Sequence, residues 1–162
     1  MTSADGPNWS MPDEKALDWD FVYTPRWLRN VCWAVAAVVI AIHLVFGLLL
    51  NISYTGVGVG WSDKIGLIAV GLDIAAVCLL PTRARLRVGP AGVGVRNLVS
   101  ERVWGWDQVH GVEYPEKGAW AQLLLPHDEH VPVMAIGARD GERAVAAMEK
   151  CRELQGTYAP KR

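Results

Sequence analysis

Residues 31–50 of the chain read VCWAVAAVVIAIHLVFGLLL, and residues 65–80 read IGLIAVGLDIAAVCLL. The first run has 20 residues without a formal charge, and the second has 16 residues and one charge, Asp73. About 20 helical residues at ~1.5 Å each cross the hydrocarbon core of a bilayer. The second run reaches this length with residues 61–64, since Trp and Lys sit readily at the membrane interface. The sequence therefore predicts a transmembrane hairpin over residues 25–82, with helices over about 27–50 and 62–80.

The alternative for these two runs is a pair of buried helices in a soluble core, because a helix that is apolar all round fits either environment. A soluble chain of 162 residues would rarely bury 36 such residues with so few polar positions. A signal peptide also fits the first run poorly. The run begins 30 residues into the chain and exceeds the usual ~7–15 apolar residues. The pattern therefore favours a chain that lies in a lipid bilayer.

Basic residues gather at the two ends of the predicted hairpin that adjoin the rest of the chain, whereas the connection between the helices carries one Lys beside one Asp. The five are Arg26, Arg29, Arg83, Arg85 and Arg87. An excess of Lys and Arg marks the cytoplasmic side of a membrane protein. We therefore expect a two-pass plasma-membrane protein with both termini in the cytoplasm and the turn at 51–61 outside. All five are expected at the membrane surface, where Arg83, Arg85 and Arg87 would meet the anionic inner leaflet at about 1 kcal/mol each.

Composition argues against a general nucleic-acid-binding role. The chain has 16 basic and 17 acidic residues, a net charge of −1, so no global basic field would attract a phosphate backbone. The three cysteines, Cys32, Cys78 and Cys151, form neither a disulfide framework nor a metal-binding spacing. We interpret them as small packing residues.

Two polar side chains interrupt the apolar runs. His43 lies seven residues before the end of the first run and Asp73 eight residues into the second, so an antiparallel hairpin places them at nearly the same depth. A carboxylate in hydrocarbon costs roughly 2.5–3.5 kcal/mol on insertion scales. We therefore expect His43 and Asp73 to face each other or a common partner helix. The contact would be a proton relay, a subunit-assembly contact or a structural hydrogen bond that fixes helix register, and the sequence leaves these three open.

Small residues share the predicted helix faces of these two polar groups. Ala36 and Gly47 accompany His43, and Asp73 is accompanied by Gly66, Ala69 and Ala76. Small residues let membrane helices approach closely. Because two helices leave much surface uncovered, the predicted partners are the lipid bilayer and either a membrane protein or a second copy of the chain.

After Pro81 the pattern changes from a helical period to a period of two. The alternation predicts six strands, over residues 83–88, 93–98, 101–106, 109–114, 119–125 and 131–135. A helix follows, capped by Asp140, ending near Gly156, and burying a stripe of apolar residues. The stripe is Ala144, Ala147, Met148, Cys151 and Leu154. The predicted class is α+β: a two-helix transmembrane hairpin, then a small antiparallel β-sandwich or barrel with a C-terminal capping helix, over residues 83–157.

The sequence predicts a tail at each end of the chain. Residues 1–24 carry five acidic residues against one Lys, together with Pro7 and Pro12. This composition predicts an acidic, disordered N-terminal tail whose last aromatic residues rest on the membrane surface or on the protein's own domain. Residues 158–162 form a short C-terminal tail.

Four features follow the hairpin in a fixed order. They are Leu86-Arg87-Val88, then Gly92-Val93-Gly94-Val95-Arg96-Asn97, then Trp106-Asp107-Gln108-Val109, and the closing helix. Together with the hairpin this order resembles the bacterial pleckstrin-homology (PH-like) membrane proteins of actinobacteria, over about residues 25–156. The resemblance implies a cytoplasmic β-domain of seven strands, one more than the pattern predicts, tethered to the membrane without a catalytic role.

The resemblance also implies lipid binding, as in eukaryotic relatives. Phosphoinositide-binding members carry Lys and Arg around the first strand-to-strand loop. We take residues 89–92 as that loop, and they carry no charge. This departure argues against recognition of a specific headgroup.

The polar residues of the domain form no recognisable catalytic pattern. The run His127-Asp128-Glu129-His130 offers imidazole and carboxylate groups that suit zinc. Adjacent loop residues seldom point at one ion, so we interpret this run as a polar turn. We predict no catalytic residue, no metal and no cofactor.

Three functions remain open from the sequence. The first is a protein-binding adaptor, for which Trp104 and Trp120 form the candidate interaction surface, because aromatic residues are enriched in interface cores. The second is an accessory subunit of a larger membrane complex, with the Asp73 face buried against it. The alternative to both is a PH-like domain that senses membrane lipid.

Overall fold

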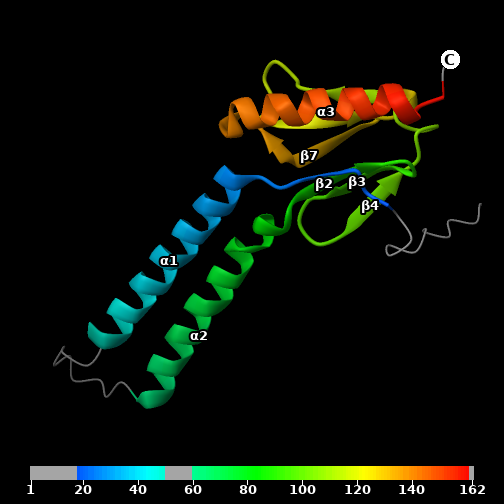
Figure 1. Ribbon diagram of the computed structural model, residues 1–162. Coiled ribbons are helices and arrows are strands. Elements are labelled where there is room, and N and C mark those ends of the chain that lie inside the picture. Colours follow the sequence, from blue (N-terminus) through cyan, green and yellow to red (C-terminus); the bar gives the residue numbers. More distant parts are fainter. Residues whose placement is uncertain (1–17, 50–59, 161–162) are drawn as a thin grey trace, which may run out of the picture.

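The structure is a computed structural model that describes residues 18–49 and 60–160. Most of the predicted N-terminal tail and most of the predicted turn between the helices lie outside these residues. Two long helices run side by side away from a body made of two sheets and a third helix (Figure 1). In chain order the elements are β1 (Phe21–Tyr23), α1 (Arg26–Leu49), α2 (Trp61–Cys78), η1 (Leu80–Arg83), β2 (Arg85–Gly89), β3 (Gly92–Arg96), β4 (Glu101–Trp104), β5 (Gly111–Glu113), β6 (Trp120–Leu124), η2 (Pro126–Asp128), β7 (His130–Gly137), η3 (Ala138–Asp140) and α3 (Glu142–Tyr158).

Helices α1 and α2 form the predicted hairpin, and both are long and apolar enough to cross a membrane. They meet through small residues. Ala36 and Gly47 of α1 and Gly71 and Ala75 of α2 are buried. At Gly71 the helices lie so close together that a Cβ atom there would be 2.5 Å from Cγ of His43. The small-residue face predicted for α1 is therefore the face that packs against α2.

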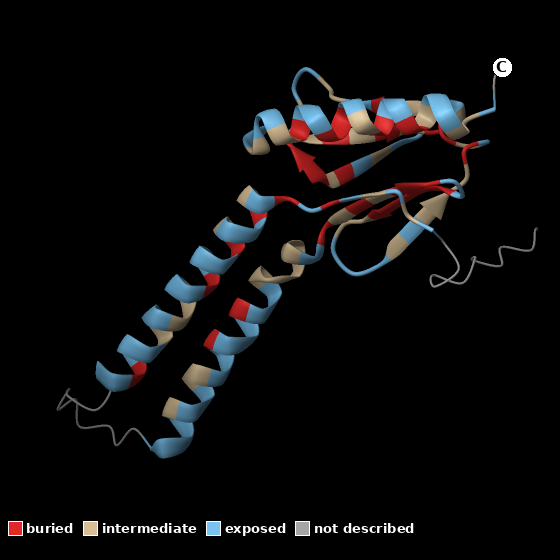
Figure 2. Cartoon of the chain, in the orientation of Figure 1, coloured by how far each residue is buried: buried red, intermediate tan, exposed pale blue. Residues whose placement is uncertain are grey.

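Large apolar residues occupy much of the rest of both helices, and most of the surface of the two helices is exposed (Figure 2). Within the apolar spans, 17% of the α1 stretch and 11% of the α2 stretch are buried inside the molecule. A core helix of a soluble protein would be mostly buried. The hairpin thus presents an apolar surface on its outside as well as at its helix–helix contact.

The body consists of two antiparallel sheets with strand orders β1-β2-β3-β4 and β5-β6-β7. Strand β2 alternates as predicted, with Leu86 and Val88 buried. It turns into β3 between the paired residues Gly89 and Gly92. Gly92 has φ of 139°, a conformation that residues with a side chain rarely adopt. The tight turn therefore depends on this glycine.

Helix α3 packs against β5, β2 and β7 and completes the domain core. The five residues predicted as its buried stripe are all buried, and they join the buried residues of both sheets in one cluster. Tyr158 at the helix end donates a hydrogen bond from its hydroxyl to Asp20 at 2.6 Å. The predicted α+β class, with two apolar helices followed by an antiparallel PH-like domain and a C-terminal helix, is confirmed.

The last part of the predicted tail at residues 1–24 is not disordered, and its aromatic residues Phe21 and Tyr23 dock on the protein's own domain, which was one of the two expected places. Residues 21–23 form β1, which pairs antiparallel with β2 through Phe21 opposite Val88 and Tyr23 opposite Leu86. Tyr23 is buried in the domain core, so β1 both pairs with the edge of β2 and contributes to the inner face of the sheet. This strand is the seventh that the resemblance implied, and it lies before the hairpin.

Because β1 precedes the hairpin, the connection between the first two strands is the hairpin itself. The uncharged turn at 89–92 is the second connection. The prediction that this turn corresponds to the first strand-to-strand loop of phosphoinositide-binding members is therefore wrong.

The predicted cap of α3 is also wrong. The residue before α3 is Gly141, without a side-chain cap. The carboxylate of Asp140 instead accepts a hydrogen bond from the backbone N–H of Trp27, in the first turn of α1, at 3.0 Å. Free N–H groups at a helix start are satisfied by such acceptors. Asp140 therefore ties the domain to the hairpin.

Candidate functional site

The hairpin and the domain are joined by a second, smaller apolar cluster. Its buried members are Leu28 and Cys32 of α1 and Ala84, which follows η1. Partly buried residues from α1, from the end of α2, from β6 and from β7 pack against it: Trp27, Leu79 (the residue after α2), Trp120 and Met134. Since these side chains come from both parts of the chain, the hairpin is packed against the domain and not merely linked to it.

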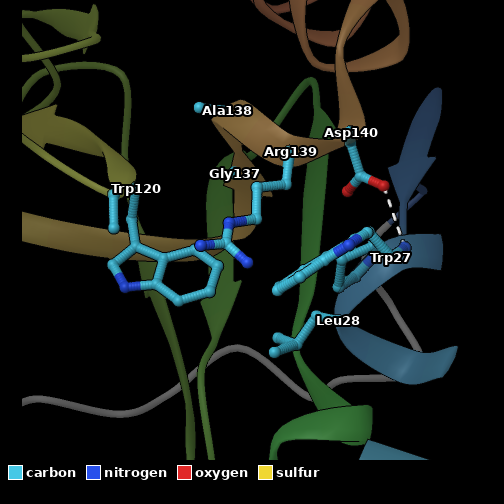
Figure 3. Close-up of a pocket in the computed structure, with 9 residues that line it drawn as sticks. Trp27, Leu28, Trp120, Gly137, Ala138, Arg139 and Asp140 are labelled. Carbon is cyan, nitrogen blue, oxygen red and sulfur yellow. Dashed lines mark hydrogen bonds between the residues drawn. The ribbon is translucent and has the colours of Figure 1, made fainter. Parts of the chain in front are cut away.

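A polar and aromatic group lies beside this cluster (Figure 3). The guanidinium carbon of Arg139 lies 4.5 Å from the ring centroid of Trp27, a cation–π contact. Asp140 holds the backbone of the same Trp27 and lies 3.9 Å from the guanidinium of Arg143. This carboxylate therefore has two partners and is largely withdrawn from solvent.

Tyr23 belongs to the same corner of the molecule. Arg143 lies over its ring, with 5.3 Å between the guanidinium carbon and the ring centroid. Burial raises the pKa of the Tyr23 hydroxyl, and the nearby Asp140 carboxylate raises it further. The hydroxyl is therefore neutral at physiological pH, and the formal charges of this corner are those of the arginines and Asp140.

A pocket of about 300 Å³ opens between the first turn of α1 and the domain. Its walls are mostly apolar and come from three distant parts of the chain. They are formed by Pro25, Trp27, Leu28, Ala119, Trp120, Gly137, Ala138, Arg139 and Asp140. Trp120 lies over Gly137, where a Cβ atom would come within 3.0 Å of the indole ring. Figure 3 shows Trp120 and Trp27 with Arg139 between them.

The five predicted membrane-surface arginines divide into two groups. Arg26, Arg29 and Arg83 are exposed at the ends of the hairpin. Arg85 and Arg87 lie on β2 and pair with Glu101 of β4. The nitrogen Nε of Arg85 donates to its carboxylate at 3.1 Å, and a guanidinium nitrogen of Arg87 lies 3.4 Å from it. A role at the lipid surface stays a prediction for all five arginines. Arg26, Arg29 and Arg83 are more exposed than Arg85 and Arg87.

The structure does not bring His43 and Asp73 together. His43 is half-buried against Gly71 and donates from Nδ1 to the carbonyl of Val39 at 2.8 Å. Asp73 is exposed on α2, on the face turned away from α1. Among the described residues it has no hydrogen-bond or ion-pair partner. A direct contact between the two is therefore not formed within the hairpin, and the common partner helix stays a prediction.

Trp104 and Trp120 do not form one surface. Trp104, on β4, is partly buried against the domain core, whereas Trp120 packs on the cluster at the hairpin. The predicted interaction surface is thus divided between two internal contacts. Its use in binding a partner stays a prediction.

Residues 127–129 of the polar run lie in the connection between β6 and β7, as the turn interpretation expected, and His130 is the first residue of β7. Within residues 18–49 and 60–160, no group of three or more His, Cys, Asp or Glu side chains is arranged to hold a metal ion. Cys151 is buried on α3, and burial raises the pKa of its thiol to about 12. A thiol in this state is a poor nucleophile.

Comparison with known proteins shows which protein family this chain is related to. A family model described as a bacterial PH domain matches residues 83–154. Uncharacterised proteins of Mycobacterium bovis and of Mycobacterium tuberculosis strain H37Rv are each 44% identical to this chain over 143 residues, covering 88% of the chain and 93% of the relative. The chain belongs to the bacterial PH domain family. No solved structure matches it significantly.

Family membership confirms the predicted resemblance, including its actinobacterial range, since the relatives are mycobacterial. The part that matches the family model begins after the hairpin and so omits β1. The aligned length of the mycobacterial relatives is greater, at 88% of the chain, and must therefore include sequence outside that part.

Sequence reasoning missed the pocket of this bacterial PH domain protein. No sequence motif includes Arg139, Ala119 or Gly137. Asp140 was expected to cap α3, whereas its carboxylate accepts a hydrogen bond at the start of α1. One local signal was available, because Gly137 ends a strand at the point where a bulky Trp on the neighbouring strand needs space.

Proposed function

We propose that this protein is a non-enzymatic, two-pass plasma-membrane protein that holds its PH-like domain in the cytoplasm. We propose further that it acts as a protein-binding adaptor or accessory subunit of a larger membrane complex. The relatives carry no functional description, so the proposal rests on the surfaces of this chain.

The membrane location is supported by the apolar outer surface of the hairpin. Exposed residues on it include Phe46 and Leu48 of α1 and Ile65 and Val77 of α2, each at least 60% exposed. At roughly 25 cal/mol per Å² of apolar surface, exposure of two such helices to water would be prohibitive. Lipid removes that cost.

The orientation follows from charge. The exposed Arg26, Arg29 and Arg83 all lie where the hairpin meets the domain, and Lys64 is the basic residue at the opposite end among the described residues. The positive-inside rule places the arginine-rich end, and with it the domain, in the cytoplasm.

The single observation that carries the partner proposal is the Asp73 face of α2. Gly66, Ala69 and Ala76 are exposed on the same side of the helix as Asp73, and a Cβ atom at Gly66 would meet nothing within 4 Å. An unpaired carboxylate in lipid costs roughly 2.5–3.5 kcal/mol on insertion scales. A partner helix that packs on the small residues and offers a donor to Asp73 removes this cost.

The alternative, lipid sensing through basic residues of the domain, has weaker support. Arg85 and Arg87, which a headgroup would need on β2, both lie against Glu101. Recognition of a headgroup there would have to compete with this carboxylate.

The test is purification of the full chain from its native membrane in mild detergent, followed by mass spectrometry of bound proteins and measurement of the mass of the complex. We expect a partner, or a second copy, in fixed stoichiometry. Asp73→Ala should reduce its recovery several-fold. Leu72→Ala is the matched control, because Leu72 is the neighbouring exposed residue and is 53% exposed.

Two results would contradict the proposal. One is a monomeric chain without a stoichiometric partner that binds anionic vesicles in a headgroup-dependent way, which would favour the lipid sensor. The other is equal recovery of the partner with Asp73→Ala and with the wild-type chain.

A further inference from the structure

The pocket at the hairpin–domain junction plays no part in the partner contact proposed for α2. Its wall at Trp27 and Leu28 belongs to the first turn of α1, whereas the Asp73 face lies on α2 and points away from α1. We propose that this pocket binds an anionic glycerophospholipid of the surrounding leaflet, with its phosphate at Arg139 and the upper part of one acyl chain among the Trp side chains. The inference rests on the membrane location proposed above.

The lining suits an amphiphilic ligand. Two indole rings, Leu28 and Pro25 supply apolar walls, and a volume of about 300 Å³ lies at the lower end of the range of small-molecule pockets, roughly 300–1,000 Å³. Such a volume holds a segment of a lipid and not a whole one. The remainder of the acyl chains would stay in the bilayer beside α1.

The charge of the pocket rim selects an anion. Arg139 is exposed, and its contact with the ring of Trp27 holds the guanidinium at the rim while leaving its edge able to donate hydrogen bonds. Asp140 is the acidic residue in the lining, and its carboxylate is turned to the N–H of Trp27 and to Arg143. Arg26 and Arg29 are exposed on the first turn of α1. These two arginines do not line the pocket, but they add positive charge to the same end of α1, so Arg139 is the cation placed to meet the phosphate.

The position gives a lipid direct access. Trp27 and Leu28 form one wall of the pocket and also begin the apolar helix, so a lipid that lies along α1 reaches the pocket without leaving the leaflet. The opposite wall, at Ala119, Trp120 and residues 137–140, belongs to the domain. A lipid in this place would contact both parts of the chain and fix the angle between them.

The proposal can be tested by photolabelling the full chain in phosphatidylcholine vesicles. The vesicles carry a small fraction of phosphatidylglycerol with a diazirine near the glycerol end of one acyl chain, or the matching phosphatidylcholine probe. We expect adducts on residues 119–120 and 137–140 to be several-fold more abundant with the phosphatidylglycerol probe. Arg139→Gln should lower the adducts from the phosphatidylglycerol probe to the abundance seen with the phosphatidylcholine probe. Arg139→Lys, which retains the charge, should keep part of the preference for the phosphatidylglycerol probe.

A second variant tests the cavity itself. Ala138 lines the pocket with an exposed side chain, so Ala138→Trp should fill the pocket without disturbing the core and should abolish adducts from both probes. Arg152→Gln is the control for loss of a positive charge, because Arg152 is exposed on α3 and does not line the pocket. It should leave the labelling unchanged.

Adducts on residues 61–78 report insertion of α2 into the bilayer. They distinguish failure of the proposed lipid site from failure of the proposed membrane location. Labelling of α2 without labelling of the pocket would overturn the lipid site alone, as would equal pocket labelling by the two probes or by wild type and Arg139→Gln. Absence of adducts on α2 would overturn the membrane location. Protection of the pocket by a bound protein, detected as loss of adducts in the purified complex, would assign it to a protein partner instead.

Discussion

The close approach of the two helices at Gly71 offers a stringent test of how they pack. Gly71→Ala adds one methyl group that would lie 2.5 Å from Cγ and 2.6 Å from Cβ of His43. Carbon atoms pack best at about 3.5–4.0 Å. The helices must therefore separate by roughly 1 Å, or His43 must leave its position and its hydrogen bond to Val39. Overpacking of this kind costs about 1–3 kcal/mol, or about a 5- to 150-fold change in the folding equilibrium.

The same substitution at Gly66 provides the matched control. Gly66 lies on the same helix with nothing within 4 Å of a Cβ atom. In the monomeric chain, where no partner helix covers this face, the change should be neutral or should stabilise the helix by up to about 1 kcal/mol, because Ala is the better helix former. A double variant that compensates the larger residue at position 71 with a smaller one at position 43 completes the experiment. In the Gly71→Ala and His43→Gly double variant the added methyl group has room, and a double-mutant cycle measures the coupling between the two positions.

The assay is SDS-driven unfolding of the full chain in mixed micelles, followed by energy transfer between a donor on α1 and an acceptor on α2. We expect Gly71→Ala to unfold at lower SDS than Gly66→Ala, and the double variant to recover most of the difference after the intrinsic cost of Gly in α1 is subtracted. Equal midpoints for the two alanine variants, or a coupling energy near zero, would refute the packing of His43 on Gly71.

Three further predictions concern the domain. Leu86→Ala removes a side chain with 0% exposure from β2 and should lower the free energy of unfolding by about 2–5 kcal/mol in urea titrations, whereas Leu98→Ala, at 42% exposure, should have little effect. Glu101→Gln removes the charge shared by Arg85 and Arg87 and should cost about 1–3 kcal/mol in the same titration; Glu153→Gln, which breaks an exposed pair with Lys150, should cost less than about 1 kcal/mol. Burial raises the pKa of the Cys151 thiol from 9.0 to about 12, so the unfolded chain releases this proton more readily than the folded one. Stability from this group is therefore fully present below pH 9.0 and falls as the pH rises towards about 12. Peptide mapping after iodoacetamide treatment near neutral pH should find Cys151 unmodified in the folded chain, and rapid modification there would contradict its burial.

Periodic patterns made much of the fold predictable from the sequence. Residues 31–49 of the first apolar run lie in α1 and residues 65–78 of the second lie in α2, and the alternation after Pro81 gives strands at all six predicted places. The stripe from Ala144 to Leu154 is buried throughout. In these segments each local pattern agrees with the burial that the tertiary fold imposes.

What could not be predicted depends on contacts between segments that are distant in the chain. Strand β1 has three residues, too few for a period, and its partner β2 begins more than 60 residues later. Asp140 precedes a helix and satisfies the ordinary rule for a cap, but the nearest free N–H belongs to Trp27, 113 residues away. The pocket is assembled from three such segments, so none of them carries a recognisable signal by itself.

The place of β1 ahead of the hairpin also determines when the domain can be completed during synthesis. Its partner strand emerges from the ribosome after both apolar helices. If the hairpin lies in the bilayer as proposed, the two strands can meet only when the intervening polypeptide has crossed the bilayer an even number of times. A chain threaded once would leave Tyr23 and Leu86 in different compartments and the β2 edge open to aggregation. Closure of the first sheet is thus a structural checkpoint for correct membrane integration, and an excised fragment starting at residue 83 would lack the strand that seals it.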